Sequence, residues 1–292
     1  MEVSKTVVFS HDGDLADHIK GCEHDILWEI VQKHVQPGAK ILEAGAGSGR
    51  WLAFLANHGY KMVGVELNAK SVERFIVYFP NIRYDVGDVT VLPYPDEDFD
   101  AVLSLGVLEH FVDGAGLALK EMNRVLKDGR SAFISVPFAN SIWKIEKLKD
   151  KIVYQILGSN FLRRLLKRKA RTYNMREQEE YFDKLSRHLI KEIDFKLRFD
   201  PSEGITFYEY RFQVNKFLEL IKKHGFHPSD IYLEYSEQRL YQVFGFLVGK
   251  YTPGKGVTLN SLGAFISSVI PKRWIAHMII AVATKSKTKN VE

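Results

Sequence analysis

The chain has 292 residues, of which 46% are hydrophobic, and its formal net charge is +5 with a sequence pI near 9.0. Its single cysteine, Cys22, excludes an internal disulfide framework, and no His/Cys cluster suggests a metal site. No apolar run approaches the roughly 18 residues of a membrane-spanning helix, and residues 1–5 do not resemble a signal peptide, so the sequence predicts a cytoplasmic protein with a large buried core.

The first predicted element is a helix within an N-terminal arm, residues 1–36. Its apolar residues recur at the spacing of one helix face, at Ile26, Leu27, Ile30 and Val31. Pro37-Gly38 should end this helix. From there to residue 138, predicted strands alternate with predicted helices, which is typical of a parallel sheet.

The first predicted strand runs into a glycine-rich turn, in the stretch Ile41-Leu42-Glu43-Ala44-Gly45-Ala46-Gly47-Ser48-Gly49-Arg50, and a helical pattern follows at once. Glycine adopts positive φ and has no Cβ, so a ligand can lie directly against the backbone. Free N–H groups at the start of a helix attract an anionic group. A nucleotide-like ligand is therefore expected over Gly45–Gly49.

The spacing of these glycines disfavours the common nucleotides. The dinucleotide fingerprint is G-x-G-x-x-G, but here the third glycine comes one residue early and Arg50 stands where the last glycine belongs. The phosphate-binding loop G-x-x-x-x-G-K-[ST] is not matched either. NAD, FAD, ATP and GTP are thus disfavoured, and a dehydrogenase is a distant alternative.

Acidic residues follow the next two predicted strands. The second strand, Lys61–Glu66, ends in Glu66 about 20 residues past the glycines, where such folds place an acid on ribose hydroxyls. The third strand, 82–89, carries Asp88, which is placed to accept from an exocyclic amine. Ligands of open parallel sheets bind beyond the carboxyl ends of the strands, so these acids should converge on the glycine turn.

A fourth predicted strand, Phe99–Leu105, leads to Leu108-Glu109-His110, and a helix-and-turn pattern, Leu119–Gly129, precedes a fifth strand, Ser131–Val136. In this order the motifs resemble the class I S-adenosylmethionine (SAM)-dependent methyltransferases, in the small-molecule, type 11-like branch. The resemblance is close over residues 37–138 and resumes loosely from Tyr208. It implies a Rossmann-like α/β fold with a seven-stranded, mostly parallel sheet, helices on both faces, and a helical insertion after strand 5.

The resemblance also implies a site for SAM, with S-adenosylhomocysteine as the product. Gly45, Gly47 and Gly49 would face the methionine part. Glu43 would lie near the amino group of that part, and Glu66 would hold the ribose.

Four further residues would complete the implied cofactor site. Asp88 would contact the adenine amine, with Val89 and Leu67 flanking the ring. Leu105 would help to line the pocket beneath the sulfonium. His110 is the first candidate for a general base, because an imidazole can take a proton near neutral pH; the alternative is that Glu109 and His110 are an ordinary helix start.

Residues 139–205 interrupt the alternation and are predicted as a basic, amphipathic helical insertion that would form a lid or acceptor region. Residues 142–176 hold eleven Lys or Arg and two acids, a balance of +9 that leaves −4 for the rest of the chain. An apolar stripe recurs at helical spacing, at Ile142, Ile145, Leu148, Ile152 and Ile156.

Three interpretations of this insertion stay open. It is a solvated lid packed on the core, a helix on an anionic membrane surface through residues 142–171, or a nucleic-acid patch. Nucleic acid is disfavoured, because no recognised RNA-binding module is present and the remaining surface is net acidic.

Residues 206–292 are predicted to complete the core sheet. A helix is expected from the spacing of Val214, Phe217, Leu218 and Ile221, and strands are expected at 231–233 and 276–283. Tyr208, Tyr210 and Arg211 re-enter the core in this interpretation and are candidates for the acceptor pocket.

The expected activity is methyl transfer from SAM to an oxygen, carbon or nitrogen atom of a small or lipid-like, amphipathic molecule. The absence of an Asn-Pro-Pro-Tyr or Asp-Pro-Pro-Tyr run after the fourth strand argues against amino methylation of bases. An RNA or protein methyltransferase that uses the basic insertion is an alternative. A non-catalytic SAM-binding protein is another, and it would bind the ligand without turnover.

Overall fold

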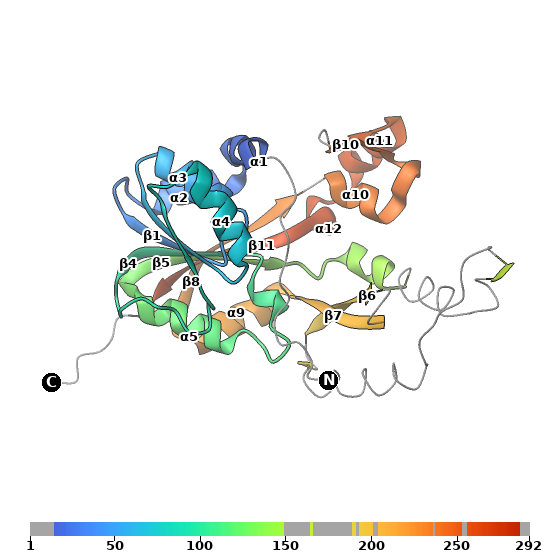
Figure 1. Ribbon diagram of the computed structural model, residues 1–292. Helices are drawn as coiled ribbons and strands as arrows, with labels where there is room; N and C mark the ends of the chain where they lie inside the picture. The colour runs from blue at the N-terminus through green and yellow to red at the C-terminus, as the bar shows by residue number, and fades with distance from the viewer. Residues whose placement is uncertain are drawn as a thin grey trace. The chain divides into compact units, whose positions relative to one another are not determined.

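The computed structural model describes residues 15–148, 164–165, 189–190, 193–200, 204–235, 237–252 and 256–286 (Figure 1). The chain divides into two compact units. The unit that we call the core unit comprises the described residues of 4–136, 214–232 and 279–292. The second unit comprises the described residues of 137–213 and 233–278.

The central feature is a seven-stranded sheet with the strand order β3-β2-β1-β4-β5-β11-β8. The pairs β1–β2, β2–β3, β1–β4 and β4–β5 are parallel. In register, Leu42 of β1 lies between Val63 of β2 and Val102 of β4, and all three side chains are buried. The predicted fold class is confirmed. The strands are β1 (Lys40–Ala44), β2 (Lys61–Glu66), β3 (Arg83–Val86), β4 (Phe99–Leu105), β5 (Leu126–Pro137), β8 (Phe226–Tyr235) and β11 (Ala276–Lys285).

Helices cover both faces of this sheet. In Figure 1, α2, α3 and α4 lie over one face and α5 and α9 over the other. Side chains set where two of them begin: Asp25 accepts a hydrogen bond from the Leu27 N–H, and Asn68 accepts one from the Lys70 N–H. The helices are α1 (Leu15–Gly21), α2 (Ile26–His34), α3 (Arg50–Asn57), α4 (Ala69–Tyr78), α5 (Gly116–Val125) and α9 (Val214–Lys223), with 3-10 turns at Cys22–His24 and Leu108–His110.

The core under α2 and α3 is rich in aromatic residues. Trp51 and Phe54 of α3 meet edge to face, with ring centroids 5.6 Å apart. Phe75 of α4 contacts Tyr84 of β3 in the same manner at 5.2 Å. Burial of such rings is the main favourable term for folding, about 1.5–3 kcal/mol for each large apolar side chain.

The second unit holds a helix at residues 141–148 and two antiparallel strand pairs. Its small core consists of Ile142, Leu240, Val243, Val248 and Ile275. The other elements are β6 (Asp194–Asp200) paired with β7 (Gly204–Arg211), α10 (Glu237–Phe244), a 3-10 turn at Gly245–Leu247, β9 (Gly249–Thr252) paired with β10 (Gly256–Leu259), α11 (Ser261–Val269) and α12 (Lys272–Ile275).

Buried charges support this small core. Glu146 and Arg239 form an ion pair, and both are almost fully buried. Arg211 pairs with Glu209 at 2.5 Å, and its guanidinium lies over the Trp143 ring, 4.9 Å from the centroid. Burial lowers the pKa of Arg239, the Arg211 charge lowers it further, and the carboxylates of Glu146 and Glu209 oppose this. The four charges therefore act as one network.

The helical prediction for residues 139–205 is confirmed at 141–148 and is wrong at β6. The segment Asp194-Phe195-Lys196-Leu197-Arg198-Phe199-Asp200 alternates apolar and polar residues, which is the period of a strand. In the described part of the predicted apolar stripe, Ile142 is buried, whereas Ile145 and Leu148 are exposed. Ile152 and Ile156 lie outside the described residues.

Within the range 206–292, α9, β8 and β11 appear where a helix and two strands were predicted. Tyr208, Tyr210 and Arg211, which were predicted to re-enter the core, lie in β7, which pairs with β6, and Tyr210 and Arg211 are buried. No helix of the described part of the chain has both the length and the apolar character needed to cross a bilayer.

Candidate functional site

The glycine turn lies between β1 and α3, at the carboxyl edge of the sheet. Gly45, Gly47 and Gly49 all have positive φ, of 81°, 57° and 78°. The N–H groups of Gly45 and Ala46 donate to the Val65 carbonyl at 2.9 and 3.1 Å, which ties the turn to the end of β2. The backbone is thus folded tightly where the sequence predicts a ligand.

Glu66, at the end of β2, is joined to this turn directly. Its Oε2 accepts a hydrogen bond from the Gly47 N–H at 2.9 Å, and its Oε1 accepts one from the Asn68 N–H at 2.9 Å. The predicted ribose acid therefore stands beside the glycines, half-buried. A carboxylate has about four acceptor positions, so two donors leave capacity for ligand hydroxyls.

Tyr84 is a residue of the site that the sequence analysis missed. Its hydroxyl donates to the Gly47 carbonyl at 2.7 Å from β3. Burial raises the pKa of Tyr84, and the charges of Glu66 and Glu43 raise it further, so the phenol keeps its proton and remains a donor. Gly47 is thereby held from both sides, by Glu66 at its N–H and by Tyr84 at its carbonyl.

Glu43 lies beneath the turn and is only 3% exposed. It receives a hydrogen bond from the Leu52 backbone, but its Oε2 has no hydrogen-bond partner among the described residues. Burial raises the pKa of Glu43 to about 8, with Glu66 adding to the shift and Arg50 opposing it. A buried acceptor without a donor is costly, and a ligand ammonium group would relieve that cost.

The raised pKa of Glu43 predicts that stability falls with rising pH. Between pH 4.5 and about 8 the folded chain keeps a proton that the unfolded chain has lost, so the folded state is progressively disfavoured across that window. In Glu43→Gln this dependence should vanish. Urea unfolding at about pH 5 and about pH 9 should show the wild type losing about 4 kcal/mol relative to Glu43→Gln. Parallel losses in both proteins would mean that Glu43 ionises without penalty in the fold.

Asp88 follows β3, as the sequence predicts. Its Oδ1 accepts hydrogen bonds from the Thr90 N–H at 2.8 Å and the Thr90 hydroxyl at 2.7 Å, which fix the carboxylate in a turn. Val89 beside it is buried, and Leu67, next to Glu66, is 39% exposed. These apolar groups are available to a flat ring.

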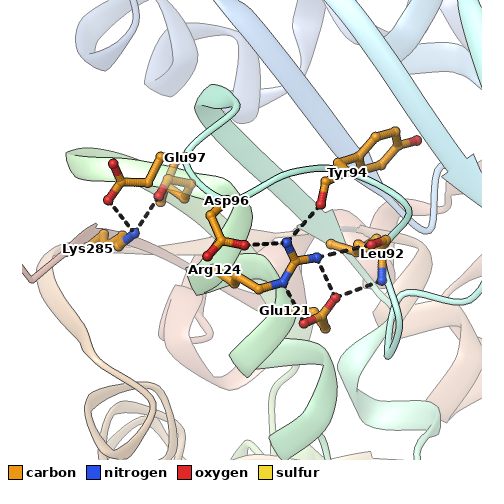
Figure 2. Close-up of polar contacts among 8 residues, drawn as sticks. Leu92, Tyr94, Asp96, Glu97, Glu121, Arg124 and Lys285 are labelled. Carbon is orange, nitrogen blue, oxygen red and sulfur yellow. Dashed lines mark hydrogen bonds and ion pairs between the residues drawn. The ribbon is translucent and has the colours of Figure 1, made fainter.

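The loop beyond Asp88 is anchored to α5 through Arg124 (Figure 2). Arg124 donates to both carboxylate oxygens of Glu121 at 2.8 Å, to the carbonyls of Leu92 and Tyr94, and to Asp96 at 2.7 Å. Glu121 in turn accepts from the Leu92 N–H at 2.8 Å. These bonds raise the pKa of Arg124 and lower that of Glu121, and they secure the segment that carries Asp88.

The end of β4 also lies against the glycine turn. A Cβ on Gly45 would fall 2.5 Å from a methyl of Val107, so the loop after Leu105 packs directly on Gly45. Leu105 is half-buried at this edge. His110, three residues past Val107, has a side chain 13% exposed, and its Nε2 is 3.8 Å from a Glu109 carboxylate oxygen.

The other candidates for an acceptor pocket have structural partners in the second unit. Tyr210 is buried, and its hydroxyl accepts a hydrogen bond from the Ile190 N–H at 2.9 Å. Arg211 is paired with Glu209, and Tyr208 is half-buried with the Lys196 ammonium 5.9 Å from its ring centroid.

A cavity of about 600 Å³ opens elsewhere on the core unit, between the start of α5 and the end of α9. None of the predicted cofactor residues lines it. It is lined by Asp113, Gly114, Gly116, Leu117, Lys120, Asn123, Lys223 and His224.

Residues 42–134 match the family model described as "Methyltransferase domain". A "Probable S-adenosylmethionine-dependent methyltransferase" of Mycolicibacterium smegmatis is 28% identical over 114 residues, which are 39% of this chain and 44% of that protein. A demethylmenaquinone methyltransferase of Beutenbergia cavernae is 30% identical over 134 residues, which are 44% of this chain and 55% of that protein. The chain thus spans about half the length of these curated relatives.

Solved structures show the same fold. A SAM-dependent methyltransferase from Methanosarcina mazei matches with a TM-score of 0.56 at 16% identity, covering 88% of this chain and 97% of the other. A 1,6-didemethyltoxoflavin N1-methyltransferase from Burkholderia thailandensis, solved with its substrate and S-adenosylhomocysteine, matches with a TM-score of 0.50 at 14% identity, covering 97% and 94%.

Proposed function

The chain belongs to the class I SAM-dependent methyltransferases through residues 42–134, and from this premise we propose that it transfers the methyl group of SAM to a small or amphipathic acceptor. The observation that carries the proposal is the buried Glu43 oxygen that lacks a donor beneath a turn braced by Glu66 and Tyr84. A turn that served only to connect β1 with α3 would not need an unsatisfied carboxylate below it.

The residues present fit SAM part by part. Glu43 offers an acceptor for the amino group of the methionine part, above which Gly45, Gly47 and Gly49 expose backbone. Glu66 keeps acceptor positions for the ribose hydroxyls. Asp88 would accept from the adenine amine, with Val89 and Leu67 flanking the ring, and Leu105 would line the pocket beneath the sulfonium. SAM brings a methyl group that is already activated on sulfonium.

The protein's contribution to the rate is then mainly geometric. Holding an acceptor atom in line with the methyl group replaces up to about 7–11 kcal/mol of barrier. An acceptor that carries a proton also needs a base, and His110 is the residue we assign, since it follows β4 three residues after Val107, which packs on Gly45. The acceptor atom is an oxygen, carbon or nitrogen.

Calorimetric titration with S-adenosylhomocysteine and with NAD tests the cofactor site. The native chain should bind the first ligand and not the second, and Glu66→Ala should weaken that binding at least about tenfold, because it removes two or more hydrogen bonds to the turn and the ribose. Glu73→Ala, an exposed acid on α4, is the matched control and should bind like the native chain. Absence of binding to the native chain would overturn the proposal.

His110→Ala should leave S-adenosylhomocysteine binding unchanged and lower turnover of an identified acceptor about 100-fold, as expected for loss of a general base. The measurement is single-turnover methylation at several pH values. Turnover at the native rate in the variant would show that His110 is not the general base. The rate enhancement would then come from positioning of the reactants alone.

The acceptor class is proposed from the curated relatives. The demethylmenaquinone methyltransferase of Beutenbergia cavernae supports a quinone-like acceptor. A phosphoethanolamine N-methyltransferase of Zea mays, of similar identity to this chain, supports a small polar or amphipathic acceptor. A "Probable tRNA methyltransferase 9B" of Bos taurus supports the RNA alternative, together with the basic segment 142–176. Methylation of lipid and quinone-like compounds, compared with tRNA over a salt series, separates the two.

Two further points concern catalysis and membrane contact. Binding of S-adenosylhomocysteine without turnover on any acceptor would favour a non-catalytic SAM-binding protein. We also propose that the protein is cytoplasmic and that its residues 142–171 contact an anionic membrane. Of this segment, only residues 142–148 and 164–165 are among the described residues.

A further inference from the structure

Helix α11 exposes large apolar side chains and no charge to solvent. Its nine residues, Ser261–Val269, contain no charged residue. Gly263 and Ser267 are buried, and Ile266 packs on the small core of the second unit. The outward positions carry the larger apolar side chains: Leu262, Phe265 and Val269 are 52%, 63% and 61% exposed. A surface helix of a soluble protein normally turns its large apolar side chains toward the core and its polar side chains toward solvent.

The turn before β9 extends this apolar face. Phe246 and Leu247 are 83% and 56% exposed. The start of α11 is fastened to this turn, because the Asn260 N–H donates to the Val248 carbonyl at 3.0 Å and the Asn260 side-chain amide donates to the Leu247 carbonyl at 3.0 Å. The Cα of Gly263 lies so close to the Val248 carbonyl that a Cβ would fall 1.9 Å from it.

The other end of α11 leads into α12, where Trp274 is 40% exposed. We call the whole set the α11 face. Its members are Phe246, Leu247, Leu262, Phe265, Val269 and Trp274.

The charged residues of the segment that carries the α11 face have one sign. Residues 245–278 contain no Asp or Glu, whereas Lys250, Lys255, Lys272 and Arg273 are basic. Lys250, Lys272 and Arg273 are exposed. The exposed apolar residues of α4 are different, since Ile76 and Val77 share their helix with charges of both signs.

We propose that the α11 face docks on an anionic phospholipid bilayer, with its aromatic and aliphatic side chains in the interface and the three exposed cations at the headgroups. An uncharged outer face, aromatic side chains at the rim and flanking cations without acids are the features of peripheral lipid binding. This docking is independent of methyl transfer, and it is a second membrane contact beside the one proposed for residues 142–171.

Vesicle sedimentation of the full chain tests the proposal. The native chain should bind mixed phosphatidylcholine–phosphatidylglycerol vesicles more tightly than pure phosphatidylcholine vesicles. Phe265→Ser combined with Val269→Ser should weaken binding to both kinds at least about tenfold, since apolar insertion is lost. Lys272→Glu with Arg273→Glu should remove only the preference for anionic lipid, and added salt should do the same.

The matched control is Val77→Ser with Val91→Ser, two side chains of the core unit that are 77% and 74% exposed. It should bind vesicles like the native chain. Circular dichroism and S-adenosylhomocysteine titration verify that each variant is folded.

Three results would overturn the proposal. The first is no vesicle binding by the native chain. The second is binding that survives the Phe265 and Val269 substitutions but is lost on Arg163→Glu with Arg164→Glu, which would assign it to the basic segment. The third is a dimer in light scattering that Phe265→Ser dissociates without any change in vesicle binding, which would make the α11 face an interface between copies.

Discussion

Gly49→Ala is expected to lower the free energy of unfolding by about 2–5 kcal/mol and to abolish binding at the proposed SAM site. Gly49 has φ +78°, a conformation that costs an L-residue about 1–2 kcal/mol. A Cβ there would also lie 2.3 Å from the Phe75 ring, which is fully buried, stacks on Phe79 and meets Tyr84 edge to face. The ring has no room to retreat, so the glycine turn itself must move. Urea unfolding and S-adenosylhomocysteine titration measure the two effects.

Gly59→Ala separates the two causes. Gly59 has φ +88°, but a Cβ there would meet nothing within 4 Å, so only the backbone cost of about 1–2 kcal/mol should appear and ligand binding should persist. Phe75→Leu should offset part of the loss in a Gly49→Ala background, giving a positive coupling between the two sites. Equal losses for Gly49→Ala and Gly59→Ala would show that the Phe75 contact is relaxed at no cost.

Local sequence patterns predict the central sheet well. Strands β2 and β4 begin and end at the predicted residues, Lys61–Glu66 and Phe99–Leu105. Interior strands of a parallel sheet are buried on both faces, so they read as short apolar runs with polar residues at their ends. The same logic places Glu43, Glu66 and Asp88 at one edge, because parallel strands present their carboxyl ends together.

Contacts that depend on strand register were not predictable in this way. Tyr84 reaches the Gly47 carbonyl only because it is aligned with Gly64 of β2, whose missing side chain leaves room for the ring. No spacing along the chain reveals that alignment. The strand β6 is a different case: Phe195, Leu197 and Phe199 alternate with polar residues, but the basic segment before it favoured a helix.

Glu146→Ala is expected to destabilise the second unit by about 3–5 kcal/mol, because it removes the carboxylate that forms an ion pair with the buried Arg239 guanidinium. Arg239 is 3% exposed, and the positive charge of Arg211 in the same network adds repulsion once Glu146 is gone. A chain with two compact units need not unfold in one step, so calorimetry should show a separate transition at lower temperature for this variant.

Removing both charges should cost far less than removing one. Glu146→Leu with Arg239→Met keeps the volume and leaves the buried Arg211–Glu209 pair intact, so its stability should return to within about 2 kcal/mol of the native chain. Lys147 is the matched control: it is the next residue on the same helix, and its pair with Asp194 has side chains 52% and 36% exposed, so Lys147→Ala should cost at most about 1 kcal/mol. If the single and double variants were equally unstable, the loss would come from packing around Glu146, and the ion pair would not be the element that secures this unit.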